Sequence, residues 1–193
     1  MPSRATPTPI SLSCADSPSE RTYRSSPSRQ VGSPKSSRPV ASIVTGFTVP
    51  SFRTLQLDAA RTRQVNHFVQ AIHLARSEAM KRNATVSLCP SQDAQTCAAP
   101  GTGWEGGWIV FANLDRDAPA IRDPDEPVVQ AYAPWRGGRL RGNRATLSFR
   151  SFGQSGVTAT FTLCDSRGSD AARAVIISQT GRPRIALQTA TGH

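Results

Sequence analysis

The sequence contains no continuous apolar run long enough to cross a membrane. Its most apolar stretch, Val40–Val49, holds ten residues, whereas a spanning helix needs about 20. The first thirty residues also lack the apolar core of a secretory signal. We therefore expect neither a complete membrane helix nor a conventional signal peptide in this chain.

Motifs for catalysis and for metal binding are missing as well. No serine stands in a Gly-x-Ser-x-Gly motif, and the four cysteines include no Cys-x-x-Cys pair. His67 and His73 are six residues apart, so they do not share a helical face. The segment from Asn113 to Asp117 is spaced like the start of a calcium loop, but no glycine follows Asp117. We expect no enzyme activity, no metal and no cofactor.

Composition divides the chain into a leader and one domain. Before Pro50 the sequence is dominated by Ser, Pro, Arg and Thr, and up to Pro39 its apolar residues are scattered. Such a segment cannot bury enough surface to offset its chain entropy. We therefore predict a disordered leader over residues 1–39 and a globular domain over residues 50–193, a length that allows one ordinary core.

Apolar residues recur with three- and four-residue spacing between Ser51 and Arg82, which predicts an amphipathic helix over about 51–82. Arg61 and Gln64 belong to its predicted polar face, and Asn83 suits the left-handed conformation that closes a helix. The residues of the predicted buried stripe include Val65, Phe68, Val69 and Ile72.

Short runs typical of β-strands follow the helix, separated by glycine-rich turns, over about residues 84–188. They are Thr85–Cys89, Gly107–Ala112, Val128–Tyr132, Ala145–Phe149, Thr158–Cys164, Ala174–Ser178 and Arg184–Leu187. One long N-terminal helix followed by consecutive strands predicts an α+β fold in which the helix packs on an antiparallel β-sheet domain.

The net charge of +10 is unevenly distributed. Residues 104–126 carry a balance of −4, whereas residues 127–193 carry nine arginines against two aspartates. The C-terminal half is therefore a candidate polyanion-binding surface, with an ordinary solvated basic face as the alternative.

The segment Gly181-Arg-Pro-Arg184 is the sharpest candidate site within this half. Strand alternation after a turn at Gly181 would direct Arg182 and Arg184 to the same side, where two guanidinium groups could bind one polyanion. Arg173 and Arg144 are candidate additional contacts. The alternative is an ordinary type II turn before an edge strand with exposed arginines.

Cys89 and Cys97 bracket a short loop, which suits a local disulfide in an oxidising compartment. A bridge from Cys89 to Cys164 on a neighbouring strand is the competing pairing, and the sequence leaves both open. Cys14 lies in the leader.

Several segments together resemble the GspH/FimT family of type II secretion pseudopilins and type IV minor pilins. They are Val49-Pro-Ser-Phe-Arg53, Ala75-Arg-Ser-Glu-Ala79, Leu88-Cys-Pro-Ser91, Gly107-Trp-Ile-Val-Phe111, Thr160-Phe-Thr-Leu-Cys-Asp-Ser-Arg-Gly168 and Gly181-Arg-Pro-Arg184. The resemblance extends from about Val40 to Leu187. It implies a pilin-like fold, an N-terminal helix anchored in the bacterial inner membrane, and a periplasmic β domain at the tip of a short filament.

The chain departs from the family at its N-terminal end. Members have a cleavage site, then a glutamate, then a continuous apolar helix that reaches the proline seen here as Pro50. If Gly46-Phe-Thr48 were the cleavage site, Ser51 would replace the glutamate and no apolar stretch would follow. We interpret Val40–Val49 as the last third of the membrane helix, with residues 1–39 replacing the rest through an altered reading frame or start site. Such a chain is expected to be soluble.

The resemblance supports two functional hypotheses. The first is a structural minor pseudopilin that contacts other pseudopilins or minor pilins, contributes to filament tip assembly and protein secretion, and contacts the inner membrane if an intact anchor is present. The alternative is a FimT-like minor pilin that binds double-stranded DNA during DNA uptake, because some FimT-like members implicated in uptake have a similar Gly-Arg-x-Arg tail. Arg182 and Arg184 would bind the DNA, aided by Arg173 and Arg144.

Overall fold

A computed structural model describes Cys14 and residues 45–187 of the chain. Apart from Cys14, the leader predicted over residues 1–39 lies outside the described residues, as does the first half of the segment 40–49. The predicted helix is present as α1, Thr45–Arg82, which is 38 residues long. In the described part of the chain, no helix combines the length and the hydropathy that a membrane crossing requires.

Helix α1 ends in a hydrogen-bonded cap at the position that the sequence predicts. Asn83 has a φ of 50°, in the left-handed region. Its backbone N–H donates to Met80, and the N–H of Ala84 donates to Ala79. This pair of bonds is the Schellman arrangement, which satisfies two carbonyls at the helix end. The chain then turns directly into the first strand.

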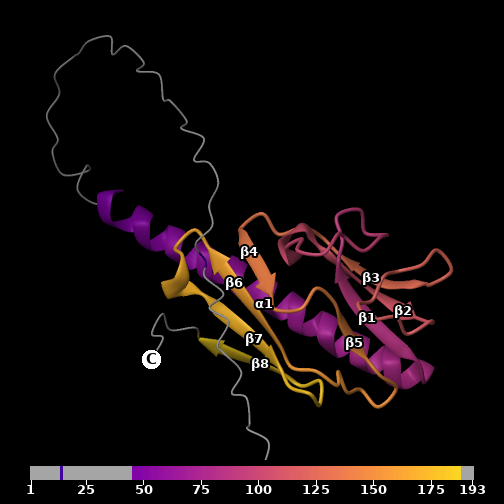
Figure 1. Ribbon diagram of the computed structural model, residues 1–193. Helices are drawn as coiled ribbons and strands as arrows, with labels where there is room; N and C mark the ends of the chain where they lie inside the picture. Colours follow the sequence, from indigo (N-terminus) through magenta and orange to yellow (C-terminus); the bar gives the residue numbers. More distant parts are fainter. Residues whose placement is uncertain (1–13, 15–44, 188–193) are drawn as a thin grey trace, which may run out of the picture.

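Within the described residues, eight antiparallel strands form two four-stranded sheets, which confirms the α+β expectation (Figure 1). The first sheet has the order β3-β2-β1-β5 and the second β4-β6-β7-β8. The strands of the first sheet are β1 (Thr85–Pro90), β2 (Trp108–Asn113), β3 (Val128–Tyr132) and β5 (Leu147–Phe149). Those of the second are β4 (Gly138–Gly142), β6 (Ala159–Asp165), β7 (Arg173–Ile177) and β8 (Pro183–Leu187). The 3₁₀ turns Trp104–Gly106 and Ser169–Ala171 precede β2 and β7.

Strand β4 is absent from the sequence-based prediction. Its sequence, Gly-Arg-Leu-Arg-Gly, has glycine at both ends and only Leu140 as an apolar residue, a composition that favours a turn. Antiparallel pairing with β6 nevertheless places Leu140 opposite Leu163. Both side chains are buried in the core, so tertiary packing overrides the local preference.

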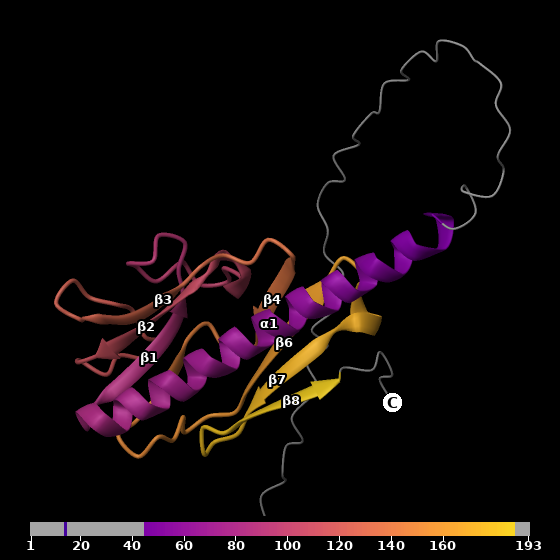
Figure 2. The same cartoon turned by 180° about the vertical axis from the view of Figure 1, so that it is seen from behind.

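Both sheets lie on the same side of α1, as the view from behind shows (Figure 2). Val65, Phe68 and Ile72 of the predicted stripe are buried, and Val69 is partly buried against the same core. Phe68 is central to this core. Its ring lies 5.5 Å from that of Trp104, 5.3 Å from that of Trp108 and 4.7 Å from that of Phe161.

Arg61 and Gln64 contradict the predicted polar face, because both are buried, with Arg61 only 4% exposed. The guanidinium of Arg61 donates to the backbone oxygen of Ala171 and to Asp58, the latter at 2.6 Å, and lies 3.6 Å from Asp165. The second sheet and the turn before β7 therefore extend over this part of the helix. The polar character of Arg61 and Gln64 in the sequence could not reveal that other elements bury them.

Arg167 completes an ionic cluster between α1 and the end of β6. It donates to Asp165 at 2.5 Å and to Asp58 at 2.9 Å. Burial raises the pKa of Asp165, but the hydrogen bonds from Arg167 outweigh this effect, and the net pKa lies below the usual value. The hydrogen bond from Arg167 also lowers the pKa of Asp58.

This ionic cluster predicts a pH-dependent contribution to stability. Carboxylates with lowered pKa values stabilise the fold fully above about pH 4, and they lose this effect as the pH falls through their folded-state pKa values. Arg167→Gln should therefore reduce the free energy of unfolding at pH 7 by on the order of 1 to 3 kcal/mol, and the difference from the original chain should narrow at pH 3. Urea unfolding at the two pH values measures it.

Arg63→Gln is the control, because Arg63 is an exposed arginine on the same helix and has no ion pair in the described part of the chain. An equal loss of stability for Arg167→Gln at both pH values would contradict the ionic explanation.

Candidate functional site

The turn between β7 and β8 presents the Gly181-Arg-Pro-Arg184 segment. The N–H of Gly181 donates to the oxygen of Ser178 at 2.8 Å, and within this turn only Gly181, at φ 75°, is left-handed. This is a type I turn followed by a left-handed glycine, a common three-residue hairpin connection. The type II turn considered from the sequence is therefore wrong, because it would need a positive φ at Thr180.

Gly181 is also sterically required. A Cβ atom built at this position would lie 2.5 Å from the backbone oxygen of Gly153 and 3.0 Å from the ring of Phe149. The turn therefore packs directly on the loop after β5. Arg76 of α1 donates to the same Gly153 oxygen at 2.9 Å, so the helix holds both loops in place.

Arg182 and Arg184 extend from one side of this hairpin. The backbone N–H of Ser178 donates to the backbone oxygen of Arg182 at 3.1 Å, and Arg184 lies opposite Ile176 in the β7–β8 ladder. Two residues apart on an extended segment, the two side chains leave the same face of the second sheet. That face is turned away from α1, because Val175 and Ile177, on the alternate positions, are buried in the core. Both arginines are exposed.

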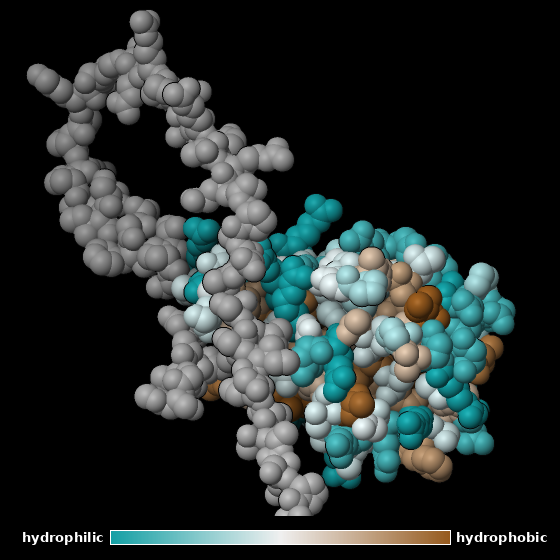
Figure 3. Space-filling view, viewed as in Figure 1, coloured by the Kyte–Doolittle hydropathy of each residue, from teal (hydrophilic) through white to brown (hydrophobic). Residues whose placement is uncertain are grey.

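Two more arginines lie on this outer face, at its opposite edge. Arg139 and Arg141 of β4 pair with Cys164 and Thr162 of β6, which places them on the same face as Arg184. Arg141 forms an ion pair with Glu105 at 3.2 Å. Basic side chains therefore border the outer face along both edge strands. On the side of the molecule shown in Figure 3, hydrophilic residues dominate the coloured surface.

The other two predicted contacts are not part of this face. Arg173 lies opposite Leu163 and Leu187, three residues from Ile176, so its side chain leaves the face that is turned toward α1. Arg144 follows β4 and donates to the backbone oxygen of Thr158 at 3.4 Å. It lines a separate cleft beside β5.

The cysteines form two disulfides. Cys89 and Cys97 are joined, with an S–S distance of 2.04 Å, and this bridge covers the outer side of the first sheet. The alternative pairing of Cys89 with Cys164 does not form, because Cys89 lies in the first sheet and Cys164 in the second. Cys164 is instead bonded to Cys14. The sequence offered no spacing signal for that pair, which is 150 residues apart.

At the end of the molecule away from the β7–β8 hairpin, α1 projects beyond the sheets (Figure 1). Phe52 and Leu55 on this part are 63% and 65% exposed, whereas burial against the domain begins at Arg61. A single exposed apolar residue is ordinary, but two on successive turns of a projecting helix form a small apolar patch.

One long helix that carries two antiparallel sheets, with basic outer edges and an apolar projecting end, defines the class: an α+β domain of pilin-like fold. A sequence profile described as "Type II transport protein GspH" matches residues 64–181, which is more than half of the chain. The chain therefore belongs to the GspH family.

Solved structures of minor pilins and pseudopilins are similar to this chain. The type IV minor pilin FimU of Pseudomonas aeruginosa is 21% identical in one crystal form, with a TM-score of 0.47 over 67% of this chain and 91% of FimU. A second crystal form gives 22%, a TM-score of 0.48, and 71% and 91% coverage. The minor pseudopilin EpsH from the type 2 secretion system of Vibrio cholerae is 12% identical, with a TM-score of 0.41 over 65% of this chain and 95% of EpsH. No curated protein sequence matches.

The close packing of the β7–β8 hairpin predicts that a side chain at position 181 destabilises the fold. Gly181→Ala combines a left-handed backbone with a collision against Gly153, and should lower the free energy of unfolding by about 2 to 4 kcal/mol. Gly101→Ala is the matched control, because Gly101 has a φ of 88° but nothing within 4 Å of the added Cβ. It should cost only about 1 kcal/mol. Thermal or urea unfolding measures both, and equal losses would show that the contact with Gly153 is unimportant.

Proposed function

We propose that this protein is a structural minor pseudopilin or minor pilin of a type II secretion or type IV pilus machinery, in which it contributes to assembly of the filament tip and to protein secretion. The observation that carries the proposal is the apolar patch of Phe52 and Leu55 on the projecting part of α1. Membership of the GspH family supports it.

Burial is the reason that this patch indicates assembly. From Val65 onward, one stripe of α1 is covered by the chain's own sheets, so that part of the helix needs no partner. Phe52 and Leu55 remain exposed to water, and covering such side chains is favourable by about 1.5 to 3 kcal/mol each. Apolar faces of neighbouring subunit helices would provide that cover.

The two disulfides support a periplasmic location for the β domain. Disulfides persist in oxidising compartments such as the bacterial periplasm, and Cys89–Cys97 closes a loop within the domain. A second bridge joins Cys164 to Cys14. Attachment to the inner membrane would require an intact apolar helix ahead of α1.

The subunit proposal predicts that the patch determines binding to neighbouring subunits. The double variant Phe52→Ser/Leu55→Ser should bind purified pseudopilin or minor-pilin subunits of the same bacterium at least about ten-fold more weakly, because two buried apolar contacts are lost. Size-exclusion chromatography and titration calorimetry measure the complex. Ile121→Ser is the control, since Ile121 is 59% exposed but lies in a loop of the β domain. Unchanged affinity of the double variant would count against the proposal.

A second candidate function is binding of double-stranded DNA in DNA uptake. The specific observation in its favour is that Arg182 and Arg184 extend from one face of a fixed hairpin. Guanidinium groups form paired hydrogen bonds with phosphate oxygens, and Arg139 and Arg141 border the same face. Such contacts would be independent of base sequence and sensitive to salt.

The DNA-binding candidate predicts a defined salt response. Arg182→Ala/Arg184→Ala should weaken binding to a DNA duplex and reduce the slope of log affinity against log salt by about 2, one unit for each phosphate contact. Gel-shift titrations at two salt concentrations measure both quantities. Arg63→Ala/Arg136→Ala removes the same charge from exposed positions elsewhere and should change the slope much less. Equal effects of the two double variants would show only a general attraction between the basic chain and DNA, and would contradict a specific site at Arg182 and Arg184.

A further inference from the structure

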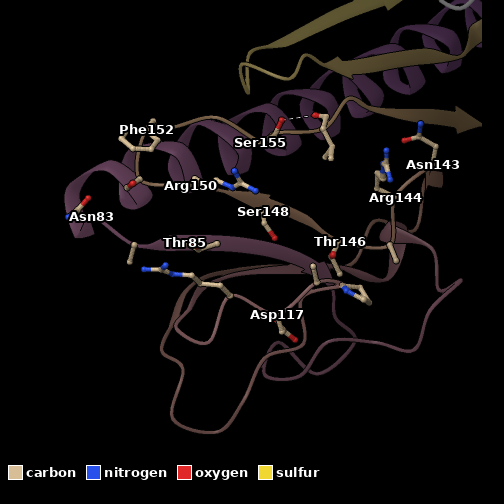
Figure 4. A pocket seen from close by; sticks show the side chains of 17 residues that line it. Asn83, Thr85, Asp117, Asn143, Arg144, Thr146, Ser148, Arg150, Phe152 and Ser155 are labelled. Carbon is tan, nitrogen blue, oxygen red and sulfur yellow. Dashed lines mark hydrogen bonds between the residues drawn. The ribbon is translucent and has the colours of Figure 1, made fainter. Parts of the chain in front are cut away.

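A polar cleft of about 830 Å³ lies beside β5, bordered by the loops before and after this strand, by the loop after β2 and by the junction of α1 and β1. The alternation of residues 146–150 explains one wall. Leu147 and Phe149 point into the core, so Thr146, Ser148 and Arg150 extend from the other side and line the cleft. Figure 4 shows Arg150 and Ser148 extending into it, with Arg144 and Phe152 at opposite ends of the view.

The charge of the cleft is basic. Three arginines line it, namely Arg116, Arg144 and Arg150, together with a single acid, Asp117. Both carboxylate oxygens of Asp117 are engaged by the chain itself, because one accepts from Asn113 at 2.9 Å and the other from the N–H of Ile121 at 2.8 Å. Within the described residues, none of the three arginines forms an ion pair. Their charge is therefore available to a ligand.

The remaining polar groups of the cleft suit anionic oxygens. Hydroxyl groups of Thr85 and Thr146 line it, with that of Ser148, which also shares a hydrogen bond of 2.8 Å with Ser87, and a hydroxyl can donate to an anion. Asn143 uses its side-chain oxygen to accept from Thr160 at 2.9 Å, which leaves its amide N–H groups as donors. Guanidinium groups and hydroxyls together are the donor set that binds phosphate esters.

Phe152 adds an aromatic ring at the rim of the cleft. It is 79% exposed, the highest fraction among the large hydrophobic side chains of the described residues. The turn that presents Phe152 is held by two backbone hydrogen bonds. The N–H of Gly153 donates to the oxygen of Arg150 at 2.7 Å, and the N–H of Arg150 donates to the oxygen of Gln154 at 2.9 Å. Arg76 of α1 also binds the oxygen of Gly153. An exposed ring on a rigid turn is suited to stacking on a planar group.

We propose that this cleft binds a short segment of single-stranded nucleic acid, with Arg116, Arg144 and Arg150 on the phosphodiester backbone and Phe152 stacked on a base. A basic groove combined with an aromatic platform is the usual arrangement for single strands. A duplex hides the faces of its bases, so it would leave Phe152 unused. An acidic peptide would satisfy the arginines but gives no reason for the aromatic ring. The site is independent of the subunit role and of the Arg182–Arg184 face.

The test uses the full chain and a fluorescently labelled oligothymidylate of about 12 nucleotides, within the usual site size. Fluorescence anisotropy at two salt concentrations gives affinity and salt slope. Phe152→Ala should weaken binding about five-fold or more through lost stacking. Arg116→Ala/Arg150→Ala should weaken it further and reduce the salt slope by about 1 to 2. Because these three side chains are exposed, circular dichroism should show an unchanged fold.

The controls distinguish the cleft from general attraction and from the hairpin arginines. Arg63→Ala/Arg136→Ala should change the affinity less than two-fold, and Arg182→Ala/Arg184→Ala should leave the stacking contribution of Phe152 intact. Loss of binding only in the Arg182/Arg184 variant would overturn the cleft proposal and favour the second candidate function instead.

Competition identifies the ligand chemistry. Unlabelled oligothymidylate should displace the probe, whereas inorganic phosphate, polyglutamate and a duplex of equal length should displace it poorly. Displacement by polyglutamate that does not depend on Phe152 would assign the cleft to an acidic peptide and contradict the proposal. Absence of oligothymidylate binding at low salt would contradict it outright.

Discussion

The packing of α1 across both sheets, through Phe68, is the interaction on which the remaining structure depends. In the described residues each sheet has its own hydrogen-bond ladder, and the two form separate four-stranded units. Phe68 contacts Trp104 beside the first sheet, Trp108 within it and Phe161 of the second sheet, so one helical residue joins the two units. Aromatic rings in edge-to-face contact favour a defined geometry as well as burial. The same helix holds Gly153 through Arg76, which fixes both the hairpin of Arg182 and the turn of Phe152.

Toward its projecting end, α1 exchanges apolar contacts for ionic ones. Arg61 and Asp165 are buried together, with Asp58 and Arg167 at the margin. Such a buried network contributes little net stability, because desolvation offsets attraction, but each group requires its partners in place. In the described part of the chain, Nε of Arg61 and Nε2 of Gln64 remain without a hydrogen-bond partner. We interpret this cluster as a directional contact that fixes the angle at which the projecting helix leaves the domain.

Local patterns in the sequence were sufficient for the elements and insufficient for their surroundings. The helix, its cap at Asn83 and seven strand segments follow from periodicity and turn chemistry. Strand β4 needed pairing with β6, and the burial of Arg61 needed a covering sheet. The positions of Arg173 and Arg144 away from Arg184 depend on ladder register and on loop packing, which one sequence does not specify. Of the cleft, the sequence predicted the strand over Ala145–Phe149 and marked Arg144 as a candidate contact, but it could not predict the cleft itself, because its other residues come from separate loops.

The distribution of surfaces along α1 separates the proposed assembly surface from the proposed ligand-binding surfaces. The apolar patch at Phe52 lies near one end of the helix, whereas Asn83 at the other end lines the polar cleft beside β5. Helical rise places these two points about 45 Å apart at 1.5 Å per residue. A subunit that covers Phe52 and Leu55 would therefore not obstruct the cleft or the β7–β8 hairpin, which packs against the loop beside it. If the chain is a filament subunit as proposed, a rigid helix with one surface at each end would let it bind its neighbours while a second, polar surface stays open to solvent.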